Sequence, residues 1–493
     1  MDAAATAFAY HDRTKHRLDR YAAGPGSLDW DAQPNPFRHW SDTARLALDR
    51  RTGTAPAGVP DLAGIAWLLR HAAAVTAWKQ YGPARWSLRA HPSSGNLHPT
   101  ETWLCARGIA GLADGLYHYQ AEDHSLELRA DLAAEPEAGP SLHLAYSSVA
   151  WREAWKYGER AFRYCQLDMG HVLGALAYAA ALLGWRPRLL TPGADELAAC
   201  LGLDRAADYA GVEPEEAEAA VCLFGAPAMP RFSRWHGRPG LLDGNPMYRW
   251  PVIDEVAAAT RGRLPPLPAG PAEVPAGVAA ETLLRRRSAQ AFDGRSELPV
   301  TAFRRLLGTL AGAAGSPAWA LWTYAARVHP VLFVHRVEGL APGLYCLPRS
   351  EAGLAGLAGA MRREFAWTPA DPELPLYKLV GAKAERTART VSCHQDIASQ
   401  CAFSVMFVAE FAGPVGADPA AWRHLHWEAG LLGHALTLAA EAEGWRGTGI
   451  GCFFDDADQE LLGLADDRYR VIYHYAVGMA VDDARLSTLP AYD

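Results

Sequence analysis

The segment RAHPSSGNLHPTE at residues 89–101 runs directly into the strand-like TWLC at residues 102–105. Pro92 cannot continue a helix, and Gly95 permits backbone conformations that other residues resist. We therefore expect a tight turn that brings small polar groups against a flat ring, with no bulky side chain between them. The alternative is an ordinary loop before a strand. The small polar groups of the turn belong to Ser93, Ser94 and Asn96.

The length and composition of the chain indicate a globular protein of two domains. At 493 residues it is too long for one ordinary core, and its 50% hydrophobic and 21% charged residues are typical of soluble proteins. A net charge of -8 gives no basic surface for nucleic acid. The first residues lack a signal-peptide pattern, and no apolar run reaches the ~20 residues of a membrane span, so we expect a cytoplasmic protein without membrane contact. The eight cysteines include no Cys-x-x-Cys pair, which favours reduced, buried thiols over disulfides.

Four motifs of the first half recur in the same order in the second half, which indicates a duplicated domain. The matched segments are 98–117 and 329–345, 161–170 and 421–430, 180–186 and 440–446, and 195–203 and 459–464. Between the copies, residues 261–276 hold five prolines and predict a stiff linker. We expect an α+β protein with one domain at residues 1–230, a linker at 231–276 and a second domain at 277–493. Two copies of one fold usually pair about a pseudo-twofold axis, as a homodimer does.

The two copies differ at three motifs. The second copy opens with RRRS at residues 285–288, where guanidinium groups and a hydroxyl can bind a phosphate, unless this is a solvated charge cluster. It also holds GTGIGCFF at 447–454, which follows a helix and so suits a flat ring better than a Rossmann nucleotide loop. The first copy has LLTPGA at 189–194 there, whereas the second lacks the Pro-Ser-Ser-Gly turn. Because each half lacks what the other retains, we expect one composite site between the copies.

These motifs resemble those of the nitroreductase-like flavoproteins, most closely the SagB/ThcOx-type dehydrogenases in a tandem, fused form. The resemblance implies two nitroreductase-like domains that bind FMN between them as an intramolecular pseudo-dimer. It implies that the arginine segment binds the FMN phosphate and ribityl chain, that the serine turn and the glycine loop contact the isoalloxazine, and that a basic residue near the C-terminus completes the phosphate site. Gln290 stands where many members have an arginine. The implied cofactor-binding residues are Arg286, Arg287, Ser288, Gln290, Pro92, Ser93, Ser94, Gly95, Asn96, Gly449, Ile450, Gly451, Cys452 and Arg485.

Lys156 and Tyr157 resemble the Lys-Tyr pair that azoline dehydrogenases of this group use to remove a proton. Hydride transfer from carbon needs a base for the accompanying proton, and a lysine desolvated beside a guanidinium has a lowered pKa. The alternative is a surface lysine and a packed tyrosine on an amphipathic helix. The segment 394–396 either lines the substrate pocket or caps a helix. We expect structural histidines at 424, 426 and 434, because no spacing suggests a metal site.

The resemblance implies an FMN-dependent dehydrogenase of a peptide-borne or small natural-product intermediate, with a reaction such as azoline to azole. Two alternatives stay open: an NAD(P)H-dependent nitro or quinone reductase, and a degenerate flavin-binding scaffold without activity. The expected partners are the substrate and biosynthetic partner enzymes, and the chain is expected to act as a monomer or as a further homo-oligomer.

Overall fold

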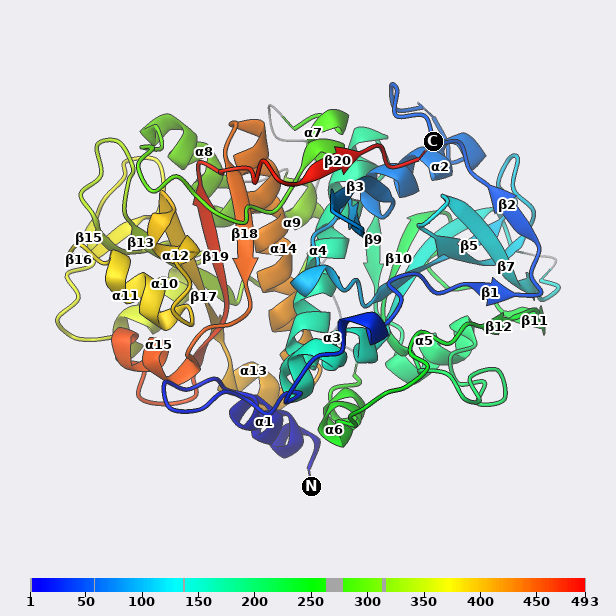
Figure 1. Ribbon diagram of the computed structural model, residues 1–493, viewed down its shortest axis with the longest axis horizontal. Helices are drawn as coiled ribbons and strands as arrows, with labels where there is room; N and C mark the ends of the chain where they lie inside the picture. Colours follow the sequence, from blue (N-terminus) through cyan, green and yellow to red (C-terminus); the bar gives the residue numbers. More distant parts are fainter. Residues whose placement is uncertain (1, 57, 136–137, 263–277, 313–315, 493) are drawn as a thin grey trace.

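Each half of the chain builds an antiparallel sheet, and two long helices lie between the sheets (Figure 1). The computed structural model describes residues 2–56, 58–135, 138–262, 278–312 and 316–492. The first sheet comprises β2 (Arg45–Ala47), β5 (Thr100–Arg107), β6 (Gly115–Gln120), β7 (Ser125–Leu132), β8 (Ser141–Ser148), β9 (Arg188–Leu190), β10 (Glu216–Phe224) and β11 (Phe232–Trp235). The second comprises β13 (Val328–Val334), β14 (Gly343–Cys346), β15 (Thr368–Pro369), β16 (Tyr377–Gly381), β17 (Phe403–Glu410), β18 (Arg446–Ile450) and β19 (Tyr469–Gly478).

The two sheets share one strand order. Apart from β2, β11 and β15, the first sheet runs β7-β6-β5-β8-β10-β9 and the second runs β16-β14-β13-β17-β19-β18. Corresponding strands also follow one another in the same order along the chain. The central strands β5 and β13 are buried along their whole length, as expected for strands covered on both faces. The repeated sequence motifs therefore correspond to a repeated topology.

The helices cover these sheets and fill the space between them (Figure 1). In the part of the chain that the structure describes, no helix is long and apolar enough to cross a membrane. The helices are α1 (Ala3–Arg13), α2 (Leu62–Ala72), α3 (Ala150–Tyr157), α4 (Ala161–Leu182), α5 (Ala194–Leu201), α6 (Pro251–Ala259), α7 (Ala280–Arg285), α8 (Val300–Ala311), α9 (Pro317–Leu321), α10 (Glu351–Ala360), α11 (Glu385–Val391), α12 (Ile397–Gln400), α13 (Ala412–Ala417), α14 (Ala421–Ala442) and α15 (Asp455–Leu462).

Helices α4 and α14 cross at two glycines that occupy matching positions in the repeat. A Cβ atom on Gly170 would lie 2.2 Å from the carbonyl oxygen of Trp427, and one on Gly430 would lie 2.1 Å from that of Leu167. Real Cβ atoms essentially never approach this closely, so the helix backbones touch only because both residues lack a side chain. The crossing therefore joins equivalent points of the two halves.

Each end of the chain packs against the opposite half (Figure 1). At the N-terminus, the Tyr10 ring lies 5.6 Å from the ring of Trp422. At the C-terminus, β20 (Ser487–Leu489) adds a strand to the hairpin of β3 (Val75–Tyr81) and β4 (Ala84–Arg89). The Tyr492 hydroxyl then donates to the Ala121 carbonyl at 2.7 Å. The exchange of both ends ties the halves together beyond their shared helix pair.

Residues 231–262 are not the linker that we expected. Strand β11 pairs with β7 at the edge of the first sheet, and β12 (Arg238–Pro239) pairs with β1 (Trp40–Ser41). Helix α6 buries Ile253 and Val256 in the core next to α1. The segment is ordered because its apolar residues pack against the core of the protein. The proline-rich remainder, residues 263–276, lies outside the described residues.

Candidate active site between the two halves

A cavity of about 1000 Å³ lies where the two halves meet. Its walls come from the turn at residues 91–96 and helix α4 in the first half, and from residues 285–290 and 446–452 in the second. This volume is at the upper end of the range for small-molecule sites. Apart from Lys156 and Arg485, every residue predicted to bind the cofactor or to act in catalysis lines this cavity.

Because the two halves are repeats, the molecule has a second position that is equivalent to this cavity. That second position is filled by protein. At this equivalent position, residues 189–194 take the place of the glycine-rich strand. The cavity that they line has a volume of about 30 Å³. The rings of Tyr324 and Trp427 pack on either side of His424, with centroid distances of 5.0 and 4.8 Å. One of the two related positions is therefore large enough for a planar cofactor.

The serine turn is a short 3-10 turn at Ser94–Asn96 with left-handed backbone, with φ of 57° at Gly95 and 60° at Asn96. Its polar side chains are bonded to the protein. The Ser94 hydroxyl donates to Asp168 Oδ1 at 3.0 Å, and Asn96 Nδ2 donates to the Ser87 carbonyl at 2.9 Å. The polar side chains therefore hold the turn in shape, and Ser93, Ser94 and Asn96 also line the cavity.

Two buried carboxyl groups lie behind this turn, and the sequence analysis missed both. Burial raises the pKa of Asp168 to about 7, although the hydroxyls of Ser93 and Ser94 and the Ser94 amide work against this shift. Burial and the nearby Asp168 raise the pKa of Glu153 well above its ordinary value. The Ser93 hydroxyl and the charge of Lys156 work against this shift. The site therefore holds two carboxyl groups that favour their protonated forms.

The raised pKa of Asp168 predicts a stability change with pH. Because the folded chain holds this proton up to about pH 7 and the unfolded chain releases it near pH 4, the free energy of unfolding falls as the pH rises through this window. We expect Asp168→Asn to remove up to about 4 kcal/mol of this fall. Urea titrations of the cofactor-free chain at several pH values measure it, with the exposed Asp19→Asn as the control. Parallel pH curves for wild type and Asp168→Asn would contradict the assignment.

Lys156 and Tyr157 both end beside the turn. A Cβ atom on Gly95 would lie 2.5 Å from the Tyr157 hydroxyl and 3.2 Å from Lys156 Nζ. Partial burial lowers the pKa of Lys156, and the charge of Glu153 opposes this shift. We had expected a guanidinium as the neighbour of this lysine, so that expectation was wrong. A lysine with a lowered pKa at the rim of a cavity can accept a proton from a ligand.

Arg286 is a buried clamp between the halves. Its Nε donates to the Ala90 carbonyl and its Nη2 to the Arg89 carbonyl, each at 2.9 Å. Its Nη1 lies 3.5 Å from the Ser288 hydroxyl. Arg286 therefore fixes the arginine segment of the second half against the turn of the first, with most of its donors used by the protein.

Arg287 is better placed to hold an anion. Its hydrogen bonds to described residues all come from Nη1, for example to the Thr76 hydroxyl at 3.1 Å, which leaves Nε and Nη2 for a ligand. Burial lowers the pKa of Arg287, and the nearby charge of Arg446 lowers it further. Lys79 and Arg446 also line the cavity, and the sequence analysis assigned neither of them to the site. Arg446 is paired with Asp482, which also lines the cavity, so Arg287 and Lys79 supply the positive charge at this end.

Arg485 does not reach the cavity, contrary to our expectation. Its side chain is 73% exposed and pairs with Asp483 at 2.7 Å. Its guanidinium lies 5.8 Å from the ring of Tyr81. The basic residue that we expected near the C-terminus therefore does not line the cavity.

The glycine-rich segment forms β18 and the turn that follows it. A Cβ atom on Gly449 would lie 1.8 Å from the Tyr473 hydroxyl, and one on Gly451 would lie 2.3 Å from the ring of Tyr164. These glycines are therefore required by two tyrosines of the cavity wall, whatever ligand is present. Strand β18 is the edge strand of its sheet, and the Ala289 amide donates to the Gly447 carbonyl at 3.2 Å. The arginine segment thus runs beside the glycine-rich strand.

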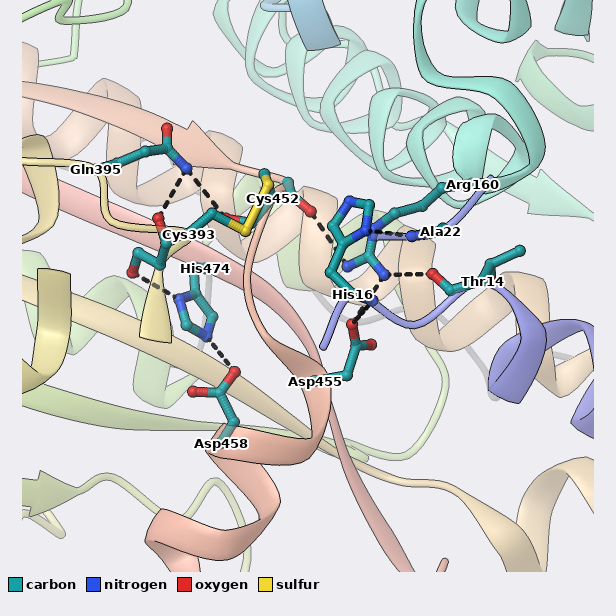
Figure 2. The surroundings of a disulfide bond; sticks show 12 residues. Thr14, His16, Ala22, Arg160, Cys393, Gln395, Cys452, Asp455, Asp458 and His474 are labelled. Carbon is teal, nitrogen blue, oxygen red and sulfur yellow. Dashed lines mark hydrogen bonds and ion pairs between the residues drawn. A yellow bond between two sulfur atoms is a disulfide. The ribbon is translucent and has the colours of Figure 1, made fainter. Parts of the chain in front are cut away.

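Cys452, at the end of this segment, forms a disulfide with Cys393, contrary to our expectation of reduced thiols (Figure 2). The two residues are 59 positions apart in the sequence, and both line the cavity. Gln395 also lines it, whereas His394 is exposed. Among the described residues, no cluster of histidine, cysteine and acidic side chains could hold a metal ion.

Comparison with solved structures reveals the fold. The chain superposes on the crystal structure of a "putative nitroreductase" from Anabaena variabilis with a TM-score of 0.73, over 97% of this chain and 99% of that one, at 23% identity. The model of the Nitroreductase family matches residues 283–479.

Two curated proteins are similar over shorter segments. A "putative nitroreductase" of Methanocaldococcus jannaschii is 31% identical over 108 residues, which are 19% of this chain and 52% of that protein. The trifolitoxin-processing protein TfxB of Rhizobium leguminosarum is 31% identical over 137 residues, which are 24% of this chain and 37% of that protein. The chain therefore spans about half or less of these relatives. It has the nitroreductase-like fold, and its second half carries a Nitroreductase family domain.

Proposed function

We propose that this chain is an FMN-dependent oxidoreductase of the SagB/ThcOx type, in which two nitroreductase-like domains form an intramolecular pseudo-dimer. The observation that carries the proposal is a large cavity whose walls come from both halves. Its donor groups fit FMN, because the Arg287 guanidinium and the Lys79 ammonium suit a phosphate. The edge strand β18 and the turn at Gly95 offer backbone to a flat ring.

The reaction that fits these residues is the dehydrogenation of a peptide-borne or small natural-product intermediate, such as azoline to azole. Bound FMN would supply the two-electron acceptor. Lys156 Nζ takes the proton from the substrate, and the Tyr157 hydroxyl holds the reacting group beside Gly95. The buried Glu153 and Asp168 behind the turn keep protons within the site. The similarity to a trifolitoxin-processing protein supports a role in the processing of a natural product.

Replacement of Lys156 tests the proton-accepting role. We expect Lys156→Met to slow anaerobic bleaching of the flavin by an azoline-bearing peptide by about 10²- to 10⁴-fold, because a positioned base contributes this much. FMN binding should be retained, since Lys156 stands beside Gly95 and Arg287 and Lys79 are unchanged. Stopped-flow absorbance measures the rate, and the exposed Lys383→Met provides a matched control.

Two results would contradict the proposed reaction. Equal rates for wild type and Lys156→Met would remove the lysine from the mechanism. Fast bleaching by NAD(P)H, without bleaching by any azoline peptide, would instead favour a nitro or quinone reductase. A colourless chain that cannot be reconstituted with FMN would favour the scaffold without activity.

A further inference from the structure

Cys393 and Cys452 differ from the other cysteines in their surroundings. Both are partly exposed and line the cavity between the halves. The cysteines outside this pair are buried, except for Cys200, which is partly exposed on α5, away from the cavity. A thiol must be accessible to react. Cys393 and Cys452 are therefore the two cysteines that a ligand in the cavity can contact.

Hydrogen bonds on either side of Cys393 hold it in place without the disulfide (Figure 2). On one side, the Ser392 hydroxyl lies 3.0 Å from His474 Nδ1, and His474 Nε2 lies 2.9 Å from the buried Asp458 carboxyl. On the other side, Gln395 Nε2 donates to the Cys452 carbonyl at 3.1 Å. These bonds would keep the two sulfur atoms close after reduction, which favours reversible formation of the disulfide.

The segment around Cys452 is also held by hydrogen bonds. The Gly451 carbonyl accepts hydrogen bonds from Arg160 Nη2 and from the Tyr164 hydroxyl, both at 3.2 Å. Arg160 and Tyr164 belong to the first half, so the cavity wall around Cys452 does not depend on the bridge. A structural disulfide, by contrast, is expected where little else joins two segments.

The backbone at the bridge is strained. Cys393 and His394 have φ of 54° and 59°, in the left-handed region that residues with side chains avoid. Such conformations are uncommon for residues with side chains and gather at functional sites. Cys393 lines the cavity and His394 follows it at the surface, so this strained backbone lies directly at the cavity wall.

We propose that Cys393 and Cys452 form a redox-active disulfide that exchanges electrons with the cofactor of the cavity. This inference rests on the proposed function, because reduced FMN supplies the electrons. The S–S bond takes up two electrons and two protons from reduced FMN and breaks into two thiols, and the flavin returns to its oxidised form. The dithiol is then reoxidised by an external disulfide, which leaves as two thiols while the S–S bond forms again. The pair thereby passes substrate electrons out of the cavity.

Electron counting tests this inference. The FMN-loaded chain is titrated with dithionite under anaerobic conditions, while flavin absorbance is followed. We expect wild type to take up about four electrons, two for FMN and two for the disulfide, and both Cys393→Ser and Cys452→Ser to take up about two. Cys200→Ser serves as the matched control and should take up about four. Uptake of about two electrons by wild type would overturn the inference.

Alkylation of the native chain without FMN is a second and independent measurement. Mass spectrometry of alkylated peptides should show that Cys393 and Cys452 become reactive in dithiothreitol and are protected again after oxidised glutathione is added. Thiols that react only after denaturation, or that never form the bridge, would contradict a redox-active pair. If the chain binds no FMN, the proposed function fails, and this measurement still decides whether the pair is redox-active.

Discussion

Expressed alone, residues 1–262 are expected to be insoluble and to hold no FMN. Helix α4 would lose its contact with α14, and the core around α2 and α4 would lose Trp427, Leu431 and Leu438. The hairpin β3–β4 would also lose strand β20. Large apolar surfaces exposed in this way lead to aggregation. The soluble fraction and gel filtration measure the outcome.

Co-expression of residues 278–493 is the control for this prediction. The second half should restore solubility and copurify with the first, because the two halves share one continuous core. A monomeric, folded first half would show that the halves are independent domains and would contradict the shared cavity.

Replacement of Gly430 by alanine is expected to be the most destabilising single change. Its Cβ atom would lie 2.1 Å from the Leu167 carbonyl and 3.0 Å from Gly170 Cα, so the two helices must move apart. Forced overpacking typically costs about 1–3 kcal/mol, and we expect the upper end of this range or more because the obstacle is backbone. We expect a large fall in the urea midpoint, or a chain that does not fold.

Gly308→Ala in α8 is the matched control. Nothing lies within 4 Å of the Cβ atom that it would introduce. Since alanine is the better helix former, this change should stabilise the chain by about 0.5–1 kcal/mol. Equal midpoints for Gly430→Ala and wild type would show that α4 and α14 do not touch as described.

Much of the fold could be predicted because the motifs repeat in order. The matched segments correspond to two sheets with one strand order, and the segments 89–101 and 285–288 indeed meet at one cavity. The exchange of chain ends could not be predicted, since β20 and α1 are short and gain their stability from the opposite half. Residues 231–262 carry prolines and glycines that suggest a linker, but tertiary contacts order them.

The predicted site was right about which segments meet and less accurate about what single side chains do. Arg286 donates to backbone carbonyls, and Arg485 pairs with Asp483. Local geometry decides which donors stay free for a ligand, and the sequence does not show this geometry. The sequence did contain a signal for Asp168, because this residue lies in a repeated motif and Glu428 occupies the matching position. The Cys393–Cys452 pair carried none, since its separation of 59 residues follows no motif.

The most direct test of a shared flavin site is an equilibrium titration with FMN of the intact chain, each half and the copurified pair of halves. We expect about one FMN per intact chain and per copurified pair, because one of the two related positions is open and the other is filled. Neither half alone should bind FMN. Binding of FMN by either half alone, or of two FMN molecules by the intact chain, would contradict a single site built from both halves.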